Sequence, residues 1–200
     1  GFAVSMDNKL LAYGIDMLSR RQYDIYIKNL ETGEIYKDKI PNTEGDPVWA
    51  NDNLTLFYTS KNAVTLLSEK IKRHKLGTDA AADKTVYEEK DPTNYIGVNQ
   101  TKSDKFIFIG SGATLSSEYR YIDANKPEDA FKVFQPRMKE VLYDVDHAND
   151  KFYIRTNLQA KNFKLMTCAE TKTDSSACTE LIAHNDKVLI QGFDLFKNYM

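Results

Sequence analysis

Residues 48–58 read VWANDNLTLFY: an apolar pair, a polar turn rich in Asn and Asp, and an apolar run. Asn and Asp favour tight turns because their side chains hydrogen-bond the neighbouring backbone. Three other stretches repeat this order of apolar, polar and apolar residues, namely VSMDNKLLAY at 4–13, VNQTKSDKFIF at 98–108 and VDHANDKFYI at 145–154. Each stretch therefore predicts two antiparallel strands joined by a short turn.

The four stretches recur at a regular distance. Tyr13, Tyr58, Phe108 and Ile154 hold equivalent positions, separated by 45, 50 and 46 residues. A repeat of about 40–50 residues with four short strands is typical of β-propeller blades. Further strands are expected at 23–30, 69–76, 117–123 and 162–167, and outer strands at 35–40, 84–88, 131–134 and 179–182.

These strands predict an all-β fold, a β-propeller-type array of four-stranded antiparallel blades. About four to four and a half blades are expected, at residues 1–45, 46–94, 95–141 and 142–186, with the start of a next blade at 187–200. The apolar tail 187–196 is interpreted as the opening strand of that blade. A β-sandwich is the alternative fold, and residues 65–74 can also be read as a helix. The residues expected in the core are Trp49, Phe57, Phe106, Phe108, Phe152 and Ile154.

The composition excludes several classes of protein. The 200 residues carry 27 Lys and Arg against 29 Asp and Glu, a formal charge of −2. This balance argues against nucleic acid or an acidic membrane surface as the main partner. No apolar run approaches the ~20 residues that span a bilayer. We expect no signal peptide, and the initial glycine indicates a processed or trimmed segment.

Two cysteines, Cys168 and Cys178, are too few for a disulfide framework. They could pair across a hairpin, but the composition favours free thiols in a reducing compartment. A cytoplasmic location is therefore expected, with the periplasm as the alternative. The two thiols do not form a zinc site by themselves, because such a site needs four ligands.

No known catalytic motif is present. Gly110-Ser111-Gly112 is not the strained G-x-S-x-G turn of a hydrolase and is interpreted as a loop turn. A glycine-rich phosphate loop, a zinc helix and a calcium loop are also missing from the sequence. No catalytic, cofactor-binding or metal-binding residue is therefore assigned, and no cofactor is expected.

Three histidines are candidate bases. His147, flanked by Asp144 and Asp146, forms the most site-like cluster, but a hydrogen-bond network at a blade turn is favoured over catalysis. His74 is expected on a solvated strand, and His184 in a turn.

Other charged groups are interpreted as exposed connections. Glu88-Glu89-Lys90-Asp91 could attract a basic substrate, but a polar link between blades is favoured. Arg20, Arg21 and Arg137 are expected in exposed loops.

Motifs along nearly the whole chain resemble, in collinear order, the propellers of the oligopeptidase B group in the prolyl oligopeptidase family of serine peptidases. They are VWANDN at 48–53 with LFY at 56–58, RHKLGT at 73–78, Asp83, VYEEKD at 86–91, LSSE at 115–118, DVDH at 144–147, FYIRTN at 152–157, AKNFKL at 160–165 and LIAH at 181–184.

This resemblance implies a seven-bladed propeller that caps an α/β-hydrolase domain and acts as a size filter. It implies cleavage of short peptides after Lys or Arg by a Ser-Asp-His triad in the hydrolase domain, which would be the propeller's partner. No position here matches the triad motifs, so the isolated chain is expected to be inactive. A free-standing propeller-like binding module is the alternative. Exposed faces of the end blades predict self-association.

Overall fold

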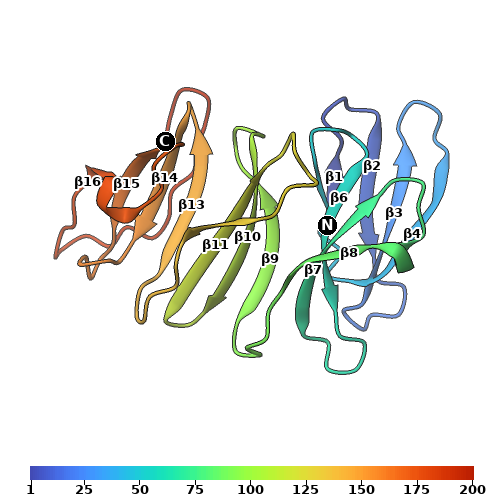
Figure 1. Ribbon diagram of the computed structural model, residues 1–200, viewed down its shortest axis with the longest axis horizontal. Helices are drawn as coiled ribbons and strands as arrows, with labels where there is room; N and C mark the ends of the chain where they lie inside the picture. The colour runs from blue at the N-terminus through green and yellow to red at the C-terminus, as the bar shows by residue number, and fades with distance from the viewer.

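The computed structural model describes residues 1–200 and contains sixteen strands and two short 3-10 helices. Figure 1 shows the strands as sheets that follow one another along the long axis of the molecule. All strand pairs are antiparallel. The all-β prediction and the prediction of four-stranded antiparallel blades are confirmed.

The four blades follow the order of the chain. The first contains β1 (Phe2–Val4), β2 (Leu10–Ile15), β3 (Tyr23–Asn29) and β4 (Ile35–Thr43), and the second β5 (Val48–Trp49), β6 (Thr55–Lys61), β7 (Ser68–Lys75) and β8 (Lys84–Glu88). The third contains β9 (Tyr95–Gln100), β10 (Phe106–Ala113), β11 (Ser116–Asp123) and β12 (Lys132–Gln135). The fourth contains β13 (Tyr143–Ala148), β14 (Lys151–Thr156), β15 (Lys164–Ala169) and β16 (Thr179–Ile182). A single pair, Thr43 with Ser60, joins the first two blades through β4 and β6.

The turn between the first two strands of each blade explains the repeated Asn and Asp. Asn8, Asn53, Asp104 and Asn149 have φ angles of 61°, 57°, 58° and 50°. Besides glycine, Asn and Asp adopt this left-handed conformation most readily. The Asn and Asp residues of the sequence repeat therefore determine the tight turns of the blades.

Apolar side chains fill the spaces between adjacent blades. Phe57 of the second blade packs with Ile107 of the third, and Phe108 of the third packs with Phe152 and Ile154 of the fourth. Trp49 lies in the cluster between the first and second blades. All six predicted core residues are buried, the most exposed being Phe106 at 8%.

Three sequence-based interpretations are wrong. The strand expected at 69–76 is β7, so the alternative reading of 65–74 as a helix is wrong, because β7 pairs along its length with β6. Gly110, Ser111 and Gly112 lie within strand β10 and not in a loop turn. The tail 187–196 contains no strand; its only β contact is the bridge between Asn185 and Val188.

The expectation of free thiols is also wrong, because Cys168 and Cys178 form a disulfide. Strand β15 pairs with β16 so that Thr167 lies opposite Thr179. The next residue pair across the strands is Cys168 and Cys178, with Cα atoms 4.5 Å apart. This distance is within the range that a disulfide requires.

Candidate functional site

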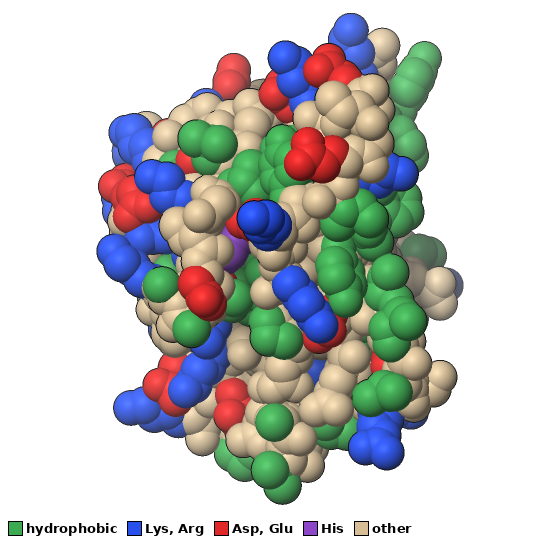
Figure 2. Space-filling view, turned by 90° about the vertical axis from the view of Figure 1, so that its right-hand side faces the viewer, with side chains coloured by type: hydrophobic (Ala, Val, Ile, Leu, Met, Phe, Trp, Pro, Cys, Tyr) green, Lys and Arg blue, Asp and Glu red, His purple; other side chains and the backbone are tan.

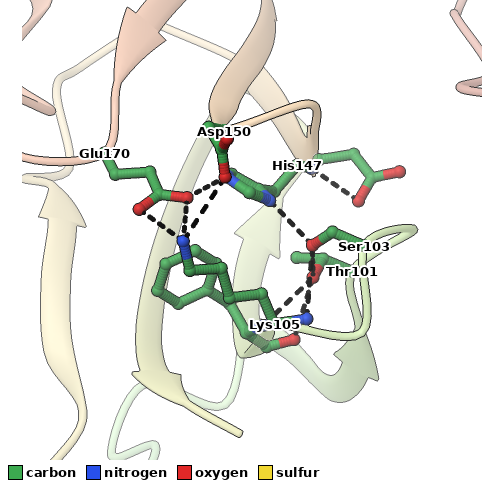
Figure 3. A network of polar contacts seen from close by, with 8 residues as sticks. Thr101, Ser103, Lys105, His147, Asp150 and Glu170 are labelled. Atoms are coloured by element: carbon green, nitrogen blue, oxygen red, sulfur yellow. Dashed lines mark hydrogen bonds and ion pairs between the residues drawn. The ribbon is translucent and has the colours of Figure 1, made fainter.

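His147 lies at the contact between the third and fourth blades, where Figure 3 shows a network of polar side chains. Its Nδ1 atom is 2.7 Å from Ser103 Oγ, in the turn between β9 and β10. Its Nε2 atom is 2.8 Å from Glu170 Oε1, in ion-pair range but without hydrogen-bond alignment. Glu170 also binds Lys105 Nζ, at 2.5 and 2.7 Å.

A histidine between a serine and a carboxylate is the arrangement of a hydrolase triad. Here, however, His147 is only 1% exposed, so a substrate cannot reach its ring. Ser103 Oγ also accepts the Lys105 backbone N–H and lies 3.0 Å from Thr101 Oγ1. The backbone N–H of Ser103 donates to the His147 carbonyl at 3.0 Å. The cluster therefore joins two blades, as the favoured interpretation of His147 predicted.

The pKa of His147 is lowered. Burial is the main cause, since it penalises the charged imidazolium. Glu170 and Asp150 favour the charged form, whereas Lys105 opposes it. The neutral imidazole is the form that this contact favours.

His74 is fully buried between the first and second blades, so the prediction of a solvated position is wrong. Its Nδ1 is 2.8 Å from Asp83 Oδ1 and its Nε2 is 3.1 Å from Asp38 Oδ1. Tyr58 donates its hydroxyl to the second oxygen of Asp83 at 2.8 Å. Burial lowers the pKa of His74, but the hydrogen bonds to Asp83 and Asp38 outweigh burial, and the net pKa is raised. Both ring nitrogens are engaged, so neither can take a proton from a nucleophile.

Ser111 belongs to a second polar contact, on β10. Its hydroxyl lies 2.6 Å from a Glu89 carboxylate oxygen, and Arg137 Nη2 donates to the Ser111 hydroxyl at 2.7 Å and to its carbonyl at 3.0 Å. Arg137 also binds Ser116 and is half-buried, so its predicted exposure is wrong. Arg20 and Arg21 are exposed as predicted.

The acidic group at 88–91 borders a hollow of about 500 Å³ between the β6–β7 hairpin and the connection before β9. The lining contains four carboxylates and three basic side chains, namely Glu44, Glu69, Glu89, Asp91, Arg21, Lys61 and Lys90. Burial raises the pKa of Glu89, but hydrogen bonds led by Ser111 produce a net lowering, so this side chain is ionised. The mixed charges support a polar connection more than a site for a basic ligand.

His184 is the last of the three histidines. His184 Nε2 is 3.8 Å from Asp186 in the segment after β16. The residues contain no cluster of three or more His, Cys, Asp or Glu side chains that could hold a metal ion. None of the helices has the length and apolar character needed to cross a membrane.

Sequence reasoning missed the partners of the histidines. Asp38 and Asp83 are 36 and 9 residues from His74, and Ser103 is 44 residues from His147. The repeat itself could have indicated Ser103, because it places the β9–β10 turn beside the β13–β14 turn of the next blade. No such signal points to Glu170.

Comparison with known proteins agrees with this architecture. The family model described as "Prolyl oligopeptidase, N-terminal beta-propeller domain" matches residues 1–200. The chain is 44% identical over 199 residues to dipeptidyl aminopeptidase BI of Pseudoxanthomonas mexicana, covering 99% of this chain and 27% of that protein. It is 32% identical to Protease 2 of Moraxella lacunata, covering 98% of this chain and 28% of that protein. The chain thus spans little more than a quarter of these relatives.

Solved structures show the same arrangement of strands. Oligopeptidase B from Leishmania major has a TM-score of 0.85 and 28% identity, covering 92% of this chain and 26% of that one. Oligopeptidase B from Trypanosoma brucei, in a closed form with covalently bound antipain, has a TM-score of 0.83 and 27% identity, covering 94% of this chain and 26% of that one. With its repeated blades and a family match over all 200 residues, this chain belongs to the N-terminal β-propeller domains of the prolyl oligopeptidase family of serine peptidases.

Proposed function

We propose that this chain is part of the propeller that gates a serine oligopeptidase, admitting short peptides and excluding folded proteins. The observation that carries the proposal is the family match over residues 1–200. The propeller's partner is the protein's own C-terminal hydrolase domain, which supplies the Ser-Asp-His triad. The boundaries between consecutive blades, near residues 45, 94, 141 and 186, remain predictions.

The substrates we propose are short peptides cleaved after Lys or Arg. The names of the Leishmania and Trypanosoma structures, both oligopeptidase B, support this assignment. We expect the chain itself to be non-catalytic, and the burial of His74 and His147, with both nitrogens of each ring facing other side chains, supports this expectation.

A second candidate activity comes from the relative with 44% identity, which is named a dipeptidyl aminopeptidase. That activity would release dipeptides from a free N-terminus. The full-length protein distinguishes the two activities with a pair of fluorogenic substrates that differ only in N-terminal blocking. Cleavage of benzyloxycarbonyl-Arg-Arg-aminomethylcoumarin supports the oligopeptidase, whereas cleavage only of the unblocked Arg-Arg substrate supports the dipeptidyl aminopeptidase.

The gating role is tested with the same arginyl sequence in two contexts. The full-length protein should cleave it in a short peptide and leave it intact in an exposed loop of a folded protein. Cleavage in both contexts at similar rates contradicts gating. No cleavage of any substrate by the full-length protein favours the alternative, a propeller-like binding module.

The location of the protein is also a proposal. Composition alone favours the cytoplasm. The Cys168–Cys178 disulfide supports the periplasmic alternative, because disulfides persist mainly in oxidising compartments. Cell fractionation with an antibody against the chain distinguishes the two.

A further inference from the structure

The loop between β15 and β16, residues 170–178, leaves the fourth blade and contacts the third; we name it the bridging loop. Glu170, drawn with Lys105 in Figure 3, binds Lys105 Nζ at 2.5 and 2.7 Å. The Thr173 carbonyl accepts a hydrogen bond of 2.7 Å from Gln135 Nε2, at the end of β12. The loop therefore fastens one blade to another at two separate points.

Three features hold the bridging loop to its own blade: the disulfide, the contact of Glu170 with His147 on β13, and the pairing of β15 with β16. The four residues of β16 are all exposed, so burial contributes little to keeping this strand in place. Its pairing with β15 comprises three residue pairs and is interrupted by a shift between Leu165 and Met166. The Cys168–Cys178 bond closes the loop at its base.

Cys168 and Cys178 differ in their access to solvent. Cys168 is 2% exposed and belongs to the apolar cluster that contains Phe134 and Phe152. Cys178 is half-buried and lines a hollow of about 310 Å³, together with Gln135, Ser175 and other side chains. Cys168 does not line this hollow. A small thiol can therefore approach Cys178 from the hollow, whereas Cys168 is shielded.

We propose that Cys178 is a site of thiol–disulfide exchange with a small thiol, and that exchange releases the bridging loop from the third blade. The thiolate attacks Cys178 Sγ, the bond between the two sulfurs breaks, and its electron pair leaves on Cys168 Sγ, which takes a proton from solvent. A second thiolate attacks the sulfur of the first thiol in the mixed disulfide. This step frees the Cys178 thiolate, which takes a proton, and yields the oxidised thiol; two thiols supply the two electrons.

Release of the loop changes the contact between blades in a defined way. Once Cys168 and Cys178 separate, the base of the bridging loop is no longer fixed. Glu170 then withdraws from Lys105 and His147, and Thr173 withdraws from Gln135. The redox state of one bond thus controls the part of the contact between the third and fourth blades that the bridging loop makes, while the apolar cluster between these blades stays in place. This inference does not depend on the proposed peptidase function.

The first test uses reduced glutathione as the thiol and the full-length protein. Acid quenching at early times followed by peptide mass mapping should place glutathione on Cys178 and not on Cys168. Glutathione on Cys168, on both residues equally, or on neither overturns the proposed site.

The second test is hydrogen–deuterium exchange in oxidised and reduced protein. Amides of residues 101–106 and 169–182 should exchange about tenfold faster after reduction, because loop closure no longer limits their opening. The double variant Cys168→Ala/Cys178→Ala should exchange at the rates of the reduced protein, and added glutathione should not change those rates. The matched variant Glu170→Gln, with its disulfide intact, should speed exchange at 101–106 but leave 174–178 protected. Equal exchange in oxidised and reduced wild-type protein overturns loop release, even if the double variant does not fold.

Discussion

His74 Nδ1 lies 2.8 Å from Asp83 Oδ1, between the first two blades, where the two side chains are 0% and 1% exposed. The other ring nitrogen faces Asp38, and the hydrogen bonds to the two carboxylates favour the charged imidazolium and raise the pKa of His74. Removing one partner from a buried charge cluster leaves an uncompensated charge. The contact between these blades is therefore sensitive to the protonation of one residue.

The raised pKa of His74 predicts the direction of its pH dependence. Its stabilising effect is complete below the unfolded pKa of about 6.5 and is lost as pH rises through the higher folded pKa. From about pH 6 to pH 9, the unfolding free energy of wild-type protein should fall more than that of His74→Gln. Urea denaturation at each pH measures this difference. A constant difference between the two proteins would show that His74 does not change protonation in this range.

His147 should respond in the opposite direction. Its lowered pKa means that its stabilising effect is present above about pH 6.5 and is lost as pH falls through the folded pKa. Between about pH 7.5 and pH 5, wild-type protein should lose more unfolding free energy than His147→Gln. The same urea titrations provide the measurement. A larger loss in the variant would contradict the prediction.

Phe152 should be among the most costly residues to truncate. It is fully buried, with ring centroids 4.9 Å from Phe134 and 5.1 Å from Phe106. Phe152→Ala should cost about 3–5 kcal/mol of unfolding free energy, since it removes transfer energy and leaves a cavity. Phe2→Ala is the matched control, because Phe2 is 76% exposed, and should change stability by less than about 0.5 kcal/mol. Similar costs at both positions would place Phe152 outside the core.

The 200-residue chain should not hydrolyse arginyl amides or react with a fluorophosphonate probe. Ser103 lies beside His147, which lies beside Glu170, but His147 is inaccessible and Ser103 Oγ accepts the Lys105 N–H. Mass spectrometry after incubation with the probe measures labelling. Stoichiometric labelling of Ser103 that disappears in Ser103→Ala would show that this cluster is catalytic.

Self-association through the end blades remains a prediction. Phe2, Val4 and Ile35 are exposed on the first blade, and Figure 2 shows hydrophobic side chains across that end of the molecule. At the other end, Leu189 is 52% exposed. Exposed apolar faces favour association, so Leu189→Glu should lower the average mass seen by light scattering at high concentration. A wild-type protein that stays at 22.9 kDa across the concentration series would contradict it.

Two features show how far sequence reasoning reached. The outer strands predicted at 84–88 and 179–182 match β8 and β16, and a short 3-10 helix that begins after an Asp precedes each of them. The tail 187–196 is as apolar as these outer strands but forms no strand. A strand needs a partner strand, and an apolar stretch of sequence does not show whether a partner is present.

The sequence by itself determined the blades and their tight turns. Alternating apolar residues, and Asn or Asp in the left-handed conformation, act on the backbone over only a few positions. Their effect can therefore be predicted from residues that are adjacent in the sequence. The tertiary structure alone decided what each polar side chain does. His74 meets a carboxylate 36 residues away, and Lys105 meets one 65 residues away. Such contacts depend on how whole blades stack, and burial then fixes whether a histidine is charged, neutral or exposed.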